Sequence, residues 1–191
     1  MKIIKYVSFV VLITVLSSFS FKQSKDSDML FWEKNVKLTW ADYKGSPDGS
    51  TEGLKAITNY HIKTGSHYFG DSVEYLIKCY VSMSASWVKK EDQNDIVLHH
   101  EQGHFDIGEI FARKLRKAVK EYAFKMQTLN KDYNNLFQNL MKECDAYDEL
   151  YDTETNKGEN MEKQKEWDKK IAKELKDFED YSSWIVKVRP N

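Results

Sequence analysis

Three of the chain's five histidines, His99, His100 and His104, lie within six positions of a segment with helical periodicity. The residues from His100 to His104 match the pattern H-E-x-x-H, in which two histidines four apart share one face of a helix. Both imidazoles can therefore reach one metal ion. Glu101 lies about 100° further round the helix, where it can contact a water on the metal without binding the metal itself. The pattern predicts zinc on His100 and His104 with Glu101 as general base; the alternative is two surface histidines beside a helix-stabilising glutamate.

The face that carries both histidines continues along the helix as an apolar stripe. Ile107 and Phe111 fall within about 20° of His100, so we expect the site to be partly buried. Gly103 flanks the same face, where the missing side chain would admit either a substrate or a packed neighbour. Glu109 lies on the opposite face, four residues before Arg113, and this spacing predicts a surface ion pair.

A catalytic zinc usually takes three protein ligands, so a further ligand must come from another segment. If the first two helices form an antiparallel hairpin that turns near Met126, His104 lies level with Asp148 and His100 with Asp152. Acidic side chains are dense here, at a helix end whose dipole disfavours them, and a bound cation would compensate them. Asp152 is the first choice for the third ligand, before Asp148 and Glu154. A solvated acidic helix end is the alternative.

Tyr151 lies in the same segment and could supply a hydroxyl that stabilises a developing oxyanion. It also continues the apolar stripe of the second helix, as does Tyr147. Catalysis and core packing are both open for Tyr151, whereas packing is the better account of Tyr147.

The sequence pattern around these residues predicts an α+β fold, in which a small N-terminal antiparallel sheet is followed by three helices. Residues 30–93 combine alternating apolar positions with turn residues and so read as strands. Residues 94–185 are helical, and the three helices are expected at about 94–122, 125–151 and 161–178. Residues 30–191 are accordingly predicted to form a single domain.

Composition narrows the function. The 191 residues contain 29 lysines and arginines against 30 aspartates and glutamates, so the chain lacks the net positive charge that attracts nucleic acid or an anionic membrane.

Lys2 and Lys5 precede an apolar stretch and then small residues, which is the layout of a signal peptide at 1–20, followed by a polar spacer at 21–29. We expect an exported protein, periplasmic or extracellular, without a membrane segment once the signal is removed. An uncleaved membrane anchor is the alternative.

Cys79 and Cys144 are the two cysteines of the chain. In an exported protein they could form a disulfide between the two halves, or they could remain two buried thiols. Two cysteines cannot make a cysteine-rich zinc site, so any metal must rest on histidine and carboxylate.

Several blocks of the chain resemble the DUF922 family of exported bacterial proteins, described as zinc-dependent proteases. These blocks are "LTWADYKGSPD", "AITNYHI", "SASWVKK", "HHEQGHFDIGEIFARKLRK" and "YDTETNKGENMEKQKEWDKKI". The resemblance implies a zincin-like architecture, with His100 and His104 as ligands and Glu101 as catalytic base. A histidine is common in the family where this chain has Lys157. If that histidine is the family's third ligand, this chain uses Asp152 or a neighbour instead, or has lost tight zinc binding.

The residues and the resemblance together predict an exported zinc metallopeptidase that acts on a peptide or protein substrate. Zinc would polarise the scissile carbonyl, and Glu101 would take a proton from the attacking water and pass it to the leaving amine. One alternative is a catalytically impaired binding or structural protein whose zinc is absent, or is structural and closed by His99 or His61. Another is a hydrolase of non-peptide amides.

Overall fold

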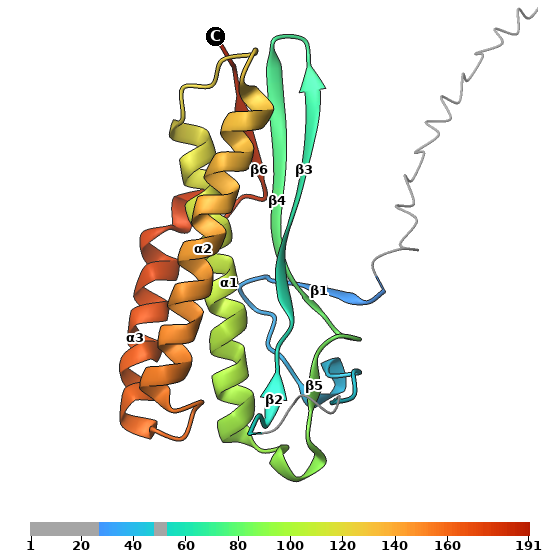
Figure 1. The fold of residues 1–191 in the computed structure, drawn as a ribbon, viewed down its shortest axis with the longest axis vertical. Coiled ribbons are helices and arrows are strands. Elements are labelled where there is room, and N and C mark those ends of the chain that lie inside the picture. Colours follow the sequence, from blue (N-terminus) through green and yellow to red (C-terminus); the bar gives the residue numbers. More distant parts are fainter. Residues whose placement is uncertain (1–26, 48–52) are drawn as a thin grey trace, which may run out of the picture.

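The computed structural model describes residues 27–47 and 53–191. The predicted signal peptide, 1–20, lies outside the described residues, as does most of the predicted spacer. Within the described part the predicted α+β class is confirmed: an antiparallel sheet packs against three helices (Figure 1).

The strands are short except for one long hairpin. In chain order the elements are β1 (Met29–Phe31), a 3-10 turn (Trp40–Asp42), β2 (Ala56–Ile57), β3 (Tyr60–Phe69), β4 (Ser72–Ser82), β5 (Trp87–Val88), a 3-10 turn (Lys90–Asp92), α1 (Asp95–Glu121), α2 (Leu129–Thr155), α3 (Met161–Asp177), a 3-10 turn (Glu179–Tyr181) and β6 (Ile185–Val188).

Strand β4 organises the main sheet. It pairs with β3 from Ser72 to Val81, and on its other side with β1 near one end and β6 near the other, always antiparallel. Side chains alternate along β4: Val73, Tyr75 and Ile77 are among those that point into the core. A separate two-stranded sheet joins β2 to β5 at the end of the molecule where α1 begins (Figure 1).

Helix α1 lies between the sheet and the other two helices (Figure 1). It begins where the Asn94 side chain accepts hydrogen bonds from the backbone N–H groups of Ile96 and Val97, which a helix start leaves without helical partners. Because α1 is covered on both sides, even its polar positions are largely buried. One apolar cluster fills the space between sheet and helices, and a second lies between the helices themselves.

The position of α1 overturns the prediction for Glu109. Its carboxylate is 1% exposed and accepts 2.9 Å hydrogen bonds from both Arg113 and Arg116, and Arg116 also donates to the carbonyl of Ile77 in β4. Helical spacing predicts a surface pair, but β4 and the segment that follows α3 cover this side of the helix. The network is a buried tie between α1 and the sheet.

Two further features could not be read from the sequence. The chain returns after α3 to add β6 to the sheet, whereas the sheet was predicted from the N-terminal part of the chain alone. Cys79 and Cys144 are both buried free thiols: the Cys144 sulfur lies 3.3 Å from the Tyr60 hydroxyl, and no disulfide joins the two cysteines. None of the helices in the described ranges combines the length and the apolar composition needed to cross a bilayer.

Candidate metal centre

The two histidines of the pattern lie one turn apart on α1 and point the same way. His100 is 3% exposed and His104 is 9% exposed, and their Nε2 atoms are 3.2 Å apart. Both continue the buried face that includes Ile107 and Phe111, as the apolar stripe predicted. The alternative of two surface histidines is therefore wrong.

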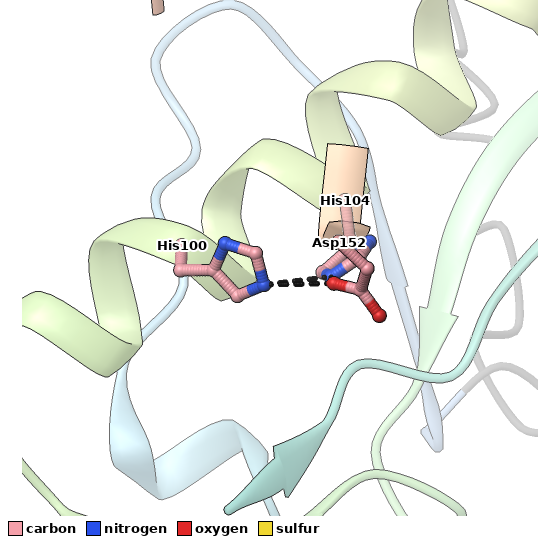
Figure 2. A group of neighbouring side chains, drawn as sticks. All are labelled: His100, His104 and Asp152. Carbon is pink, nitrogen blue, oxygen red and sulfur yellow. Dashed lines mark hydrogen bonds and ion pairs between the residues drawn. The ribbon is translucent and has the colours of Figure 1, made fainter. Parts of the chain in front are cut away.

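Asp152 completes a three-membered group from α2. Its Oδ1 lies 3.0 Å from Nε2 of His100 and 3.1 Å from Nε2 of His104, and Figure 2 shows the three side chains converging. Asp148, one turn earlier, contacts His104. The predicted hairpin register, His104 level with Asp148 and His100 with Asp152, is confirmed.

The donor set fits a divalent metal ion. Among the described residues, His100, His104 and Asp152 are the group of histidine, cysteine and acidic side chains close enough to hold one. Four ligands placed tetrahedrally at about 2.0–2.2 Å from a zinc ion lie about 3.4 Å from one another. The three donor atoms are 3.0 to 3.2 Å apart, so small side-chain movements would bring them to that spacing.

The second nitrogen of each ring is also engaged. Nδ1 of His104 lies 2.8 Å from Oδ1 of Asp148, and Nδ1 of His100 lies 3.2 Å from Oε1 of Gln164 in α3. With a metal bound, each oxygen would accept the Nδ1 proton of its histidine, so the lone pair of each Nε2 would face the metal, which is the tautomer that a metal ligand needs. Gln164 lies in the last of the blocks that resemble DUF922, but no role was predicted for it.

The cluster also shifts the acidity of its members. Burial alone would lower the pKa of His104, but hydrogen bonds with Asp148 and Asp152 and the negative charge of Glu101 raise it well above 6.5. Burial alone would raise the pKa of Asp152, but hydrogen bonds with His100 and His104 hold it well below 3.8. In the absence of a metal, a proton on His104 therefore supplies the positive charge that the carboxylates require.

Tyr151 packs against His100 and fixes the position of its ring. Its ring stacks on that of His100 with centroids 4.6 Å apart, and its buried hydroxyl donates to the His100 carbonyl and accepts from Nε2 of Gln164. A Cβ at Gly103 would lie 2.2 Å from this hydroxyl, so the missing side chain admits a packed neighbour. The hydroxyl does not line the cavity, and we assign Tyr151 a positioning role in place of the oxyanion role considered from the sequence.

Glu101 is held by two residues that the sequence did not single out. It is 5% exposed, and its Oε2 accepts a 2.6 Å hydrogen bond from the hydroxyl of Thr58. The Tyr43 hydroxyl lies 2.5 Å from the same Thr58 oxygen. Burial and the charge of Glu101 raise the pKa of Tyr43 above its ordinary value of 10, so Tyr43 stays protonated and donates to Thr58. A directed chain of two hydrogen bonds thus ends on the carboxylate.

A cavity of about 240 Å³ opens beside the cluster. One wall is α1 and α2, and the other is the strand segment around β2. The residues that line it are Leu54, Lys55, Ala56, Ile57, Thr58, Val97, His100, Glu101, His104, Asp148, Asp152 and Lys157. Every member of the H-E-x-x-H triad therefore shares one cavity with Asp152.

The other candidate ligands point elsewhere. Glu154 accepts a hydrogen bond from Trp167 in α3. His99 pairs with Asp168, and His61 lies 2.6 Å from the side-chain oxygen of Asn59. A site closed by His99 or His61 is therefore not formed.

Comparison with known proteins supports the family resemblance for the central part of the chain. Residues 81–159 match DUF922. The family's description is "Bacterial protein of unknown function". The matched stretch contains His100, Glu101, His104 and Asp152, and excludes Thr58 and Gln164. Neither the curated proteins nor the solved structures gave a match.

Proposed function

We propose that this protein is a zinc-dependent peptidase whose metal ligands are His100, His104 and Asp152. The observation that carries the proposal is the meeting of three donor atoms within 3.2 Å of one another in a cavity that Glu101 also lines. Three protein ligands are the number that a catalytic zinc usually takes. Imidazole nitrogen and carboxylate oxygen are both ligands that zinc accepts.

When bound, zinc would supply a Lewis acid that polarises the carbonyl under attack and makes a water more acidic. Asp148 and Gln164 keep both histidines in the tautomer that presents Nε2, and Tyr151 fixes the plane of the His100 ring. The protein's own groups thus set the orientation of the ligands before any substrate arrives.

Glu101 acts as the general base. Thr58 engages Oε2, whereas Oε1 makes no hydrogen bond with the described residues, and Glu101 lines the cavity. Oε1 is accordingly the atom that takes a proton from the attacking water and returns it to the leaving amine.

A peptide is the substrate that this cavity suits. Ala56 and Ile57 form β2, which pairs on one side with β5 and contributes to the cavity wall. An extended peptide can bind beside such a strand through backbone hydrogen bonds. Export is part of the proposal, based on the signal-like residues 1–20.

The test combines metal content with cleavage. Purified protein is loaded with zinc, and the metal is quantified for wild type, Glu101→Gln and the control Glu143→Gln, an exposed glutamate of α2. Cleavage of an unfolded protein such as reduced casein is then followed. We expect about one zinc per chain in all three, and cleavage only in wild type and the control. Zinc without Glu101-dependent cleavage would favour a binding protein, and absence of zinc would overturn the proposal.

A further inference from the structure

A second hollow adjoins the metal cavity and extends away from it between β3 and α2. It has a volume of about 380 Å³ and shares Ile57, Thr58 and Asp148 with the cavity at the cluster. Because these three residues line both spaces, the two hollows are neighbours. We call the second space the β3–α2 groove; its other lining residues are Asn59, Tyr60, His61, Ile62, Phe137, Met141, Cys144 and Asp145.

The α2 side of the groove changes in character along the helix. Phe137, Met141, Asp145, Asp148 and Asp152 follow one another at spacings of three and four residues, so they share one face. Asp152 is at the cluster, Asp145 is exposed beyond it, and the two large apolar side chains are half-buried at the far end. A ligand that runs along this face therefore meets carboxylates first and an apolar surface next.

The opposite side of the groove is extended backbone. Residues 57–62 include the beginning of β3, which pairs only with β4 among the described strands. An extended peptide is the ligand shape that lies against such a strand with its side chains alternating to either side.

Charge narrows the choice of ligand. Asp145 and Asp148 line the groove, and no described lysine or arginine does so. Asp148 already contacts His104, which leaves the exposed Asp145 to attract a cation. The other titratable side chains of the groove are His61 and the half-buried Tyr60 from β3 and the buried Cys144 from α2.

We propose that the β3–α2 groove binds an extended segment of polypeptide substrate beside the scissile bond, with a large apolar side chain on Phe137 and Met141 and a lysine or arginine at Asp145. This inference rests on the proposed peptidase function and names the sequence class that the site prefers. It predicts selection for cationic, apolar segments over acidic ones.

The test measures binding without catalysis. Zinc-loaded Glu101→Gln is titrated into three fluorescein-labelled nine-residue peptides of glycine and serine. Two central positions, two residues apart so that both side chains point to the same side of the extended peptide, are Leu and Lys, Leu and Glu, or Ser and Lys. These peptides are called Leu-Lys, Leu-Glu and Ser-Lys. Fluorescence anisotropy at low salt gives the three dissociation constants. We expect Leu-Lys to bind roughly tenfold more tightly than Leu-Glu, which places a like charge beside Asp145. Leu-Lys should also exceed Ser-Lys by roughly tenfold, because serine buries little apolar surface.

Two charge-reversal variants then test whether Asp145 is the residue that selects lysine over glutamate in the peptide. Asp145→Lys in the Glu101→Gln background should invert the preference between Leu-Lys and Leu-Glu. Glu149→Lys changes the net charge equally from an exposed position of α2 that does not line the groove, and should leave the preference intact. Circular dichroism confirms that both variants are folded.

Equal binding of the three peptides, or the same response to both reversals, would overturn the inference. The two proposals fail separately. If casein is cleaved in a Glu101-dependent manner but the peptides bind without preference, only the groove assignment is wrong. If the preference is found and wild type cleaves nothing, the groove assignment stands and the peptidase function is wrong.

Discussion

The hydroxyl of Thr58 donates a hydrogen bond of 2.6 Å to Oε2 of Glu101, although the two residues are 43 positions apart in the chain. Thr58 lies just after β2 and Glu101 lies in the second turn of α1, so this bond joins the two walls of the cavity. It fixes the carboxylate that the proposed reaction uses.

Replacing Thr58 tests this relationship. Thr58→Val keeps the shape but leaves a buried carboxylate without its donor, and we expect the free energy of unfolding to fall by about 1.5–3 kcal/mol in urea titrations. Thr58→Ser retains the hydroxyl and serves as the control. Equal stability of the valine and serine variants would show that the hydrogen bond does not form.

Asp148 should control the affinity for metal without binding the metal itself. In Asp148→Asn a neutral amide replaces the carboxylate at Nδ1 of His104, and we expect zinc affinity to fall roughly 10- to 100-fold by isothermal titration calorimetry. Glu149→Gln, one residue further along α2, removes the same charge from an exposed position and should bind zinc like wild type. If both variants bound zinc with the affinity of wild type, Asp148 would have no role in the metal site.

The metal-free protein should lose stability as the solution becomes alkaline. Hydrogen bonds with Asp148 and Asp152 raise the pKa of His104 above 6.5, so its protonation stabilises the fold fully below pH 6.5. This contribution disappears as the pH rises through the folded-state pKa, with a slope of up to about 1.4 kcal/mol per pH unit for one proton. Urea unfolding in a chelator between pH 5 and 10 measures it, and His104→Gln should flatten the dependence.

At acidic pH the stability of the metal-free protein should depend on pH in the opposite direction. The lowered pKa of Asp152 means that its contribution is present above about pH 3.8 and is lost as the pH falls through the folded-state value. In the proposed site a metal would compete with the proton for His104, and zinc affinity should therefore rise with pH across the range in which His104 is protonated.

Gly103 should not tolerate a methyl group. In Gly103→Ala the new Cβ would lie 2.2 Å from the Tyr151 hydroxyl, which must move and give up its bonds to His100 and Gln164. We expect a loss of about 1–3 kcal/mol in thermal or urea unfolding, together with weaker zinc binding. Gly65→Ala in β3 meets no atom within 4 Å and should be close to neutral.

The buried tie between α1 and the sheet gives a further prediction. Glu109→Gln leaves Arg113 and Arg116 buried with reduced compensation, and we expect unfolding free energy to fall by about 3–5 kcal/mol. Asp177→Asn breaks an exposed pair with Lys173 and should change stability by less than about 0.5 kcal/mol. If both substitutions changed the free energy of unfolding by similarly small amounts, Glu109 would instead form the surface ion pair that its spacing predicted.

Local periodicity was enough to predict that His100, His104 and Asp152 meet. The i, i+4 spacing placed His100 and His104 on one face, and the hairpin register brought Asp152 to them, because helices have a fixed rise and a short connection fixes their alignment. Both predictions depend only on regular geometry within two consecutive elements.

What the sequence did not reveal depends on contacts between distant segments. Nothing in the spacing relates Thr58, Tyr43 or Gln164 to the α1 helix, since the loops and the third helix that carry them have no fixed register against it. Glu109 was misplaced for the same reason: periodicity finds the apolar face of a helix but does not show whether another layer covers the polar face. The β6 strand, four residues long, alternates too briefly to be distinguished from loop.

The cavity has walls of unequal stiffness. On one side stand α1 and α2, each 27 residues long and packed along their length; on the other, β2 and β5 pair over two residues each. So short a ladder opens at far lower cost than either helix bends. A bulky peptide that enters the cavity should therefore displace the Ala56–Thr58 segment and leave α1 and α2 in place. Backbone amide hydrogen exchange should be faster in this segment than in the two helices.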